Sequence, residues 1–194
     1  MLHKKSILAL ALITAPLLAQ ATVTQGQLTF TWQATVPTVD ILSTSWKFTD
    51  ATGNDYTPSV IALQASIGND NSLDLVTQSP ATFEIRNARA SNNLNSISAY
   101  LASVPNGTGI ISPLTLKTTL AAPSDNEVVV VLNDQALKSG SSNAVTIQNN
   151  INNTSATMSL ALYAKVAQNN YTPGSSISFS TPVIFSVNVA DSSA

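Results

Sequence analysis

Apolar and polar residues alternate with a period of two along most of the chain, and this pattern predicts β-strands. Near the N-terminus, residues 26–37 read GQLTFTWQATVP, in which apolar residues alternate with threonine and glutamine. Further alternating segments are SLDLV, TFEIR, PLTLKTTL, ATMSLALYAKVA and SISFSTPVIFSVNVA, whereas the β-branched run EVVVVLND is typical of a strand buried on both faces. Turn clusters such as ATGNDYTP and GNDNS separate them. About eight short strands with frequent turns predict a single all-β sandwich.

Two segments, the last predicted strand and one near the middle of the chain, have additional features. The last strand is the most regular, and its odd-numbered residues share one face: Ile177, Phe179, Thr181, Val183, Phe185, Val187 and Val189. Pro182 within it predicts a bulge or an edge position, because proline cannot donate a ladder hydrogen bond. The segment NNLNSISAYLASVP has both helical and alternating spacing. We favour a strand there, with a short helix as the alternative.

The first residues, MLHKKSILALALITAPLLAQA, have the layout of a secretion signal. Positively charged residues near the start precede about a dozen apolar residues. Ala19-Gln20-Ala21 then gives the small-x-small pattern that signal peptidase recognises. The apolar run is shorter than the roughly 20 residues that cross a bilayer. We therefore expect cleavage between Ala21 and Thr22 and an exported, soluble product, with an uncleaved anchor as the alternative.

The amino-acid composition limits which catalytic and metal-binding side chains the protein can provide. The chain has no cysteine, and its only histidine, His3, lies in the predicted signal. Cleavage would leave no Ser-His-Asp triad, thiol nucleophile or ordinary zinc site. Two of the eight cations also lie in the signal, which leaves six against ten acids, a formal charge of −4, and this does not favour nucleic-acid binding. We expect no enzyme, cofactor or bound metal; a carboxylate pair that hydrolyses glycosides is the remaining catalytic alternative.

Two possible binding sites, one for calcium and one for a sugar, have simpler explanations as structural features. Asn and Asp cluster around Asp50 and around Asp70, but neither cluster has the spacing of a calcium loop, and turn chemistry explains both. A sugar-binding platform would have to use aromatic residues that mostly stand within alternating runs, where core or strand-face positions are favoured. These residues are Trp32, Trp46, Tyr56, Tyr100, Tyr163 and Tyr171.

Four segments carry a resemblance to a known family: GQLTFTWQATVP, LNSISAYLASVP, LNDQALKSG and ISFSTPVIFSVNV. Together they resemble the major pilins of chaperone–usher fimbriae, specifically the colonization-factor (coli surface antigen) group of enteric bacteria. The similarity extends through the mature chain. Type 1 and P pilins contain a disulfide that this chain lacks, but other colonization-factor pilins also lack it.

The resemblance implies an incomplete immunoglobulin-like Greek-key sandwich, which lacks its final strand and is completed by donor-strand exchange. It divides the chain into a signal peptide (1–21), an N-terminal donor extension (22–36) and a pilin domain (37–194). The donor residues implied by the resemblance are Leu28, Phe30, Trp32, Ala34 and Val36, with the small Ala34 at a constricted pocket and Pro37 ending the donor. The implied acceptor groove is lined in part by the last strand, with Phe179, Val183, Phe185, Val187 and Val189.

The implied function is that of a structural subunit in an extracellular fimbria that supports adhesion to host cells. The implied partners are identical subunits in a head-to-tail polymer, a periplasmic chaperone, an outer-membrane usher, a tip adhesin and a host-cell receptor. Burying the four large donor side chains at roughly 1.5–3 kcal/mol each would contribute about 6–12 kcal/mol, as an upper estimate. The alternatives are a minor or tip adhesin and a secreted, lectin-like carbohydrate-binding sandwich.

Overall fold

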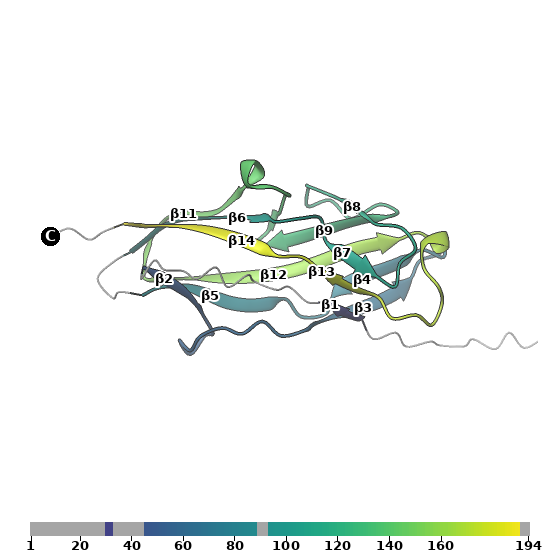
Figure 1. The fold of residues 1–194 in the computed structure, drawn as a ribbon, viewed down its shortest axis with the longest axis horizontal. Helices are drawn as coiled ribbons and strands as arrows, with labels where there is room; N and C mark the ends of the chain where they lie inside the picture. Colours follow the sequence, from purple (N-terminus) through teal and green to yellow (C-terminus); the bar gives the residue numbers. More distant parts are fainter. Residues whose placement is uncertain (1–29, 33–44, 89–92, 191–194) are drawn as a thin grey trace, which may run out of the picture.

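The computed structural model describes residues 30–32, 45–88 and 93–190, which form an open sandwich of mostly antiparallel strands (Figure 1). Its elements in chain order are β1 (Phe30–Trp32), β2 (Trp46–Thr49), β3 (Ile61–Ile67), β4 (Leu73–Thr77), β5 (Ala81–Asn87), β6 (Asn93–Leu101), β7 (Asn106–Thr108), β8 (Thr115–Leu116), β9 (Glu127–Leu132), β10 (Gln135–Ala136), the 3₁₀ turn η1 (Ser141–Asn143), β11 (Val145–Asn153), β12 (Ser155–Val166), the 3₁₀ turn η2 (Gln168–Asn170), β13 (Ser178–Ser180) and β14 (Val183–Ala190). The all-β, immunoglobulin-like expectation is confirmed. Within these ranges no helix is long and apolar enough to cross a membrane.

The larger sheet is organised around β12, its longest strand. One side of β12 pairs with β4 and β5, and the other side pairs with β9. Beyond β4 and β5, the sheet continues with two further strands: β3 pairs with β4, and β2 pairs with β5. The predicted strand EVVVVLND is β9, and its residues Val128, Val129 and Val130 are all buried, as a strand covered on both faces requires.

β12 changes register where it passes from β4 to β5. The buried Thr77 lies at this point. Its hydroxyl accepts a hydrogen bond from the backbone N–H of Leu162 at 2.8 Å and donates one to the carbonyl of the same residue at 3.0 Å. Because a buried backbone group without a partner is costly, a side chain replaces the missing ladder bonds here.

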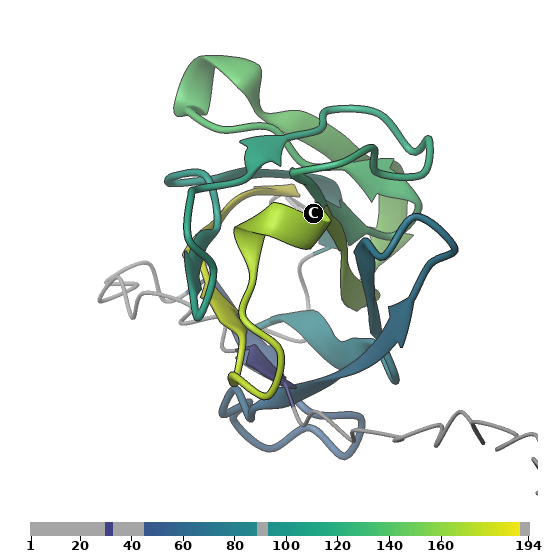
Figure 2. The same ribbon diagram turned by 90° about the vertical axis from the view of Figure 1, so that its right-hand side faces the viewer.

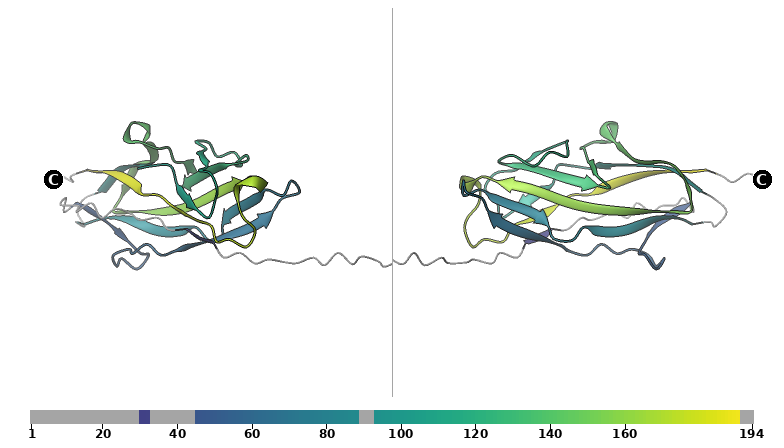
Figure 3. Two further views of the ribbon diagram at one scale, coloured as in Figure 1. Left: turned by 45° about the vertical axis from the view of Figure 1, so that its right-hand side comes forward. Right: turned by 180° about the vertical axis from the view of Figure 1, so that it is seen from behind.

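The smaller sheet has the order β11–β6–β14. The ambiguous segment is the strand β6, so the helical alternative is wrong. The alternating Ile97, Ala99 and Leu101 are fully buried against the core, and this packing favours the extended form. Pro182 separates β13 from β14, so the single last strand that we expected is two strands, which pair with β7 and β6 respectively. The strands run along the long axis of the molecule and surround one core (Figures 2 and 3).

One predicted strand is shorter than expected. PLTLKTTL contributes only the two residues of β8, which pair in parallel with β9. Leu114 is buried, but Leu120 is 57% exposed, so the alternation does not continue. The last backbone bond to β9 comes from Lys117, whose ammonium also lies 2.8 Å from the carboxylate of Glu127.

Candidate subunit interface

The outer edges of β14 and β2 border an open seam between the two sheets. In the part of the chain that the structure describes, β14 pairs with β6 on one side and has no strand on the other. β2 likewise pairs only with β5. Backbone N–H and C=O groups on such edges are available for pairing with a further strand. We call this region the seam.

The five residues predicted to line a groove form one row on the core-facing side of β13 and β14. Phe179 and Val183 are each only 1% exposed. Phe185, Val187 and Val189 are half-buried and pack against the core cluster. These three residues pair with fully buried residues of the neighbouring strand β6; Phe185, for example, pairs with Ala99. These residues therefore share a core-facing side whose apolar surface becomes partly exposed from Phe185 onward, and their role as an acceptor groove stays a prediction.

A cluster of five aromatic rings joins the two sheets beneath the seam. Phe185 of β14 lies with its ring centroid 5.3 Å from Phe48 of β2 and 5.7 Å from Phe83 of β5. Phe48 also contacts Trp46 at 5.1 Å, and Tyr56 contacts Phe83 at 5.1 Å. All but the Tyr56–Phe83 pair have the edge-to-face geometry that ring quadrupoles favour.

The sequence predicted that the last strand lines part of the groove, but it did not identify this aromatic cluster. Phe83 stood at an alternating position of the predicted strand TFEIR, but nothing local indicated that it meets Phe48. Trp46 and Tyr56 are half-buried within the cluster, whereas Tyr163 lies on the outer face of the larger sheet. The aromatic side chains that the structure describes therefore do not form a common sugar-binding platform.

A small apolar pocket adjoins the aromatic cluster. It lies between the β2–β3 connection and the start of β14. Its lining consists of Tyr56, Pro58, Ser59, Ile61, Ala81, Phe83, Leu160, Val183 and Phe185. None of these side chains is charged. The pocket is thus suited to a small apolar side chain and poorly suited to an ionic ligand.

β1 pairs with the outer edge of β3 in the same chain, with Phe30 opposite Leu63 and Trp32 opposite Ile61. It also lies beside β13 (Figure 1). The other predicted donor residues, Leu28, Ala34 and Val36, lie outside the described residues, as do Ala21 and Thr22 at the predicted cleavage site. Donation of this segment to a neighbour therefore stays a prediction.

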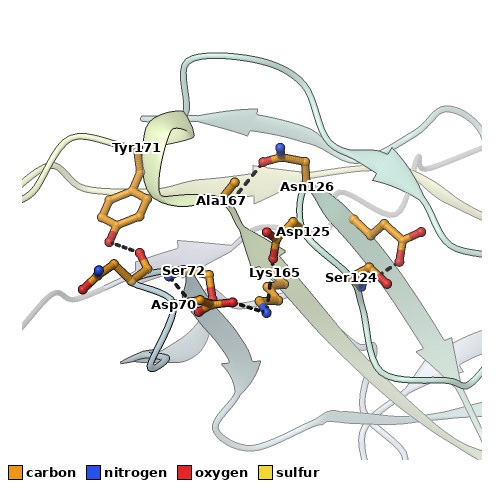
Figure 4. A network of polar contacts seen from close by, with 10 residues as sticks. Asp70, Ser72, Ser124, Asp125, Asn126, Lys165, Ala167 and Tyr171 are labelled. Carbon is orange, nitrogen blue, oxygen red and sulfur yellow. Dashed lines mark hydrogen bonds and ion pairs between the residues drawn. The ribbon is translucent and has the colours of Figure 1, made fainter.

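The Asp70 cluster, one of the two calcium alternatives, forms a polar network at one end of the molecule (Figure 4). The ammonium of Lys165 lies 2.9 Å from Asp70 and 3.2 Å from Asp125. The Ser72 hydroxyl donates to Asp70 at 2.5 Å. The Ser72 hydrogen bond and the Lys165 ammonium hold the pKa of the Asp70 carboxyl well below its usual range, and the two aspartates raise the pKa of Lys165.

The Asp50 cluster has a comparable explanation. Asp50 accepts hydrogen bonds from the Thr52 hydroxyl and from the backbone N–H groups of Thr52 and Asn54, and these bonds lower its pKa. Both clusters are thus occupied by turn and ion-pair contacts. Over the described ranges, no group of three His, Cys, Asp or Glu side chains is arranged to hold a metal ion.

Within the described residues, an immunoglobulin-like sandwich whose last strand has a free outer edge beside an apolar seam has the features expected of a subunit that can associate by adding a strand. The chain matches no protein-family model. It is 32% identical over 198 residues to the CS5 fimbrial subunit of Escherichia coli, and the match covers 95% of this chain and 96% of that protein. The chain belongs to the family of fimbrial pilins of the coli surface antigen type, as its resemblance indicated.

Proposed function

We propose that this protein is a structural subunit of an extracellular fimbria, in which identical subunits polymerise head-to-tail by donor-strand complementation. The observation that carries the proposal is the outer edge of β14, over Val183–Ala190, which pairs with no strand of the described residues and lies beside half-buried apolar side chains. Similarity to a fimbrial subunit supports the polymer. The donor would be the N-terminal segment of the next subunit, with Leu28, Phe30, Trp32, Ala34 and Val36 facing inward.

A strand added to the seam would use both its backbone and its side chains. Its backbone would pair with the edge of β14, and its apolar face would cover the row that begins at Phe185. Because the contact joins two different surfaces of the subunit, it repeats without closing and produces a filament. The polymer thereby buries apolar surface that a single subunit leaves partly exposed.

An uncovered seam would also make a free subunit prone to aggregation. We therefore propose that a periplasmic chaperone covers it during export and that an outer-membrane usher assembles the fibre, with an adhesin at the tip and adhesion to host cells as the outcome. Similarity to a structural subunit supports a non-enzymatic role. The lectin-like alternative gains no support from the aromatic side chains, since Trp46 and Tyr56 pack into the cluster.

Deletion of residues 22–36 tests the proposal. The variant should be captured by the chaperone, because it keeps β2 to β14, but it should form no detergent-resistant ladder on an unheated gel. As a matched control, Thr29→Ser and Thr31→Ser together alter only the opposite face of the donor and should leave the ladder intact. A normal ladder from the deletion variant would refute donor-strand complementation by this segment.

A further inference from the structure

In a single chain, the N-terminal segment pairs with the subunit to which it belongs. The three residues of β1 run antiparallel to β3, in the register Phe30–Leu63, Thr31–Ala62 and Trp32–Ile61. β1 also lies beside β13, the first part of the last strand (Figures 1 and 3). β3 and β13 continue the edges of β2 and β14, so Phe30–Trp32, which are part of the proposed donor, occupy one end of the seam.

We infer that a free subunit caps part of its own seam with Phe30–Trp32, and that this self-capping competes with donation of the segment to a neighbour. The inference rests on the proposed function. The competition follows from geometry, because the backbone groups of Phe30–Trp32 that pair with β3 of their own subunit cannot at the same time pair with another.

The length of the intervening chain permits self-capping. Trp32 pairs with Ile61, two residues before Leu63, which pairs with Thr77 of β4, whereas Trp46 pairs with Asn87 of β5. β4 and β5 follow one another along the same side of β12, so Ile61 and Trp46 lie about eight residues apart, or roughly 26 Å along a strand. Thirteen residues, 33–45, connect Trp32 to Trp46, and a chain of that length reaches up to about 45 Å. The tether is therefore long enough to place β1 on β3 without strain in the connection.

Tethering also gives the subunit's own strand an advantage over a neighbour's. A short flexible tether corresponds to an effective concentration in the millimolar range, about a thousandfold above a subunit present at micromolar concentration. Yet β1 covers only three residues, while the eight-residue edge of β14 has no partner within the described ranges. Self-capping should therefore delay polymerisation and leave the more extensive contact with a neighbour favoured at equilibrium.

Paired cysteines can test this register directly, because the chain contains no cysteine of its own. Thr31 and Ala62 are directly opposite in the antiparallel pair, and Ala62 is exposed. Opposite Cα atoms lie about 4.5–5.5 Å apart, which is within disulfide reach. The matched control is Thr31→Cys with Ser66→Cys. Ser66 is exposed on the same strand, but four residues further along, roughly 13 Å, it is beyond reach.

The experiment uses the exported chain, purified as a monomer and oxidised. Thr31→Cys/Ala62→Cys should form an intramolecular disulfide, seen by mass spectrometry of the linked peptides, at least tenfold more than the control pair. The oxidised variant should not polymerise, and reductant should restore the wild-type rate.

The possible failures are distinguishable. If the monomer forms no intramolecular disulfide, or if the oxidised variant polymerises as fast as the reduced one, self-capping is wrong. If deletion of residues 22–36 still abolishes the ladder in that case, the proposed function stands. Normal polymerisation of the deletion variant would instead refute the donor role itself.

Discussion

Phe185→Asp places a carboxylate on the core-facing side of the last strand, β14. In the free subunit, Phe185 is half-buried and contacts the rings of Phe48 and Phe83. Two such aromatic pairs contribute about 1–3 kcal/mol, and half of a buried phenylalanine's transfer free energy adds roughly 1 kcal/mol. The substitution should therefore lower the stability of the subunit by about 2–4 kcal/mol while the carboxylate still reaches water.

The effect on assembly should be larger than the effect on folding. A strand laid over the seam would cover position 185 and bury its charge without a partner, which costs several kcal/mol beyond the lost contacts. Since each 1.4 kcal/mol is a factor of ten in affinity, even about 3 kcal/mol weakens strand addition more than a hundredfold. Both capture by the chaperone and growth of the fibre should fail.

The assay compares Phe185→Asp with Ser186→Asp in cells that express the chaperone and usher. Ser186 is the next residue on β14 but is exposed on the opposite face, so the control adds the same charge to the same strand. We would measure subunit co-purified with the chaperone and subunit in detergent-resistant polymer. Equal amounts of polymer from the two variants would show that this face of β14 does not bind a strand.

Three further predictions concern the donor, the signal and the polar network. Ala34→Leu should slow assembly through overpacking that costs about 1–3 kcal/mol, whereas Ala34→Ser should assemble normally; equal rates for both would exclude a constricted site. The intact mass of the exported protein should correspond to cleavage after Ala21, and a mass that retains residues 1–21 would contradict this. Because folding lowers the pKa of Asp70, its contacts stabilise the fold fully above the unfolded pKa of about 3.9 and lose this effect gradually as pH falls from there through the lower folded pKa. Asp70→Asn should therefore melt at a lower temperature than wild type at pH 7, and this difference should shrink as the pH is lowered below about 4; a difference that stays constant as the pH falls would exclude the contribution.

The sequence predicted strands well because alternation is a local property of a half-buried strand. β12 and the interrupted last strand follow the predicted alternation closely. The sequence of β6 fits both the helical period and the period of two. Burial of Ile97, Ala99 and Leu101 against the core, which the sequence does not show, favours the strand. Pairing was not predictable, since contacts such as Thr77 to Leu162 join residues 85 positions apart.

The candidate interface was predictable on one strand only. The inward row of β14 could be assigned from alternation, and the structure places those residues on the expected face. The aromatic cluster brings together side chains from β2, β5, β14 and the residues before β3, and no local pattern indicates that Phe48 and Phe185 lie 5.3 Å apart. The pairing of β1 with β3 likewise depends on which edges remain free after the sheets have formed.

The position of β12 has a consequence for the rate of folding. This strand holds β4, β5 and β9 together, yet it lies at residues 155–166, near the end of the chain. A chain that emerges N-terminus first exposes the apolar faces of its early strands until β12 arrives. Such high contact order is typical of folding in milliseconds to seconds. The larger sheet therefore forms late. Until it does, the exposed apolar faces of the early strands make the subunit vulnerable to aggregation, even before the open seam of the folded subunit has formed.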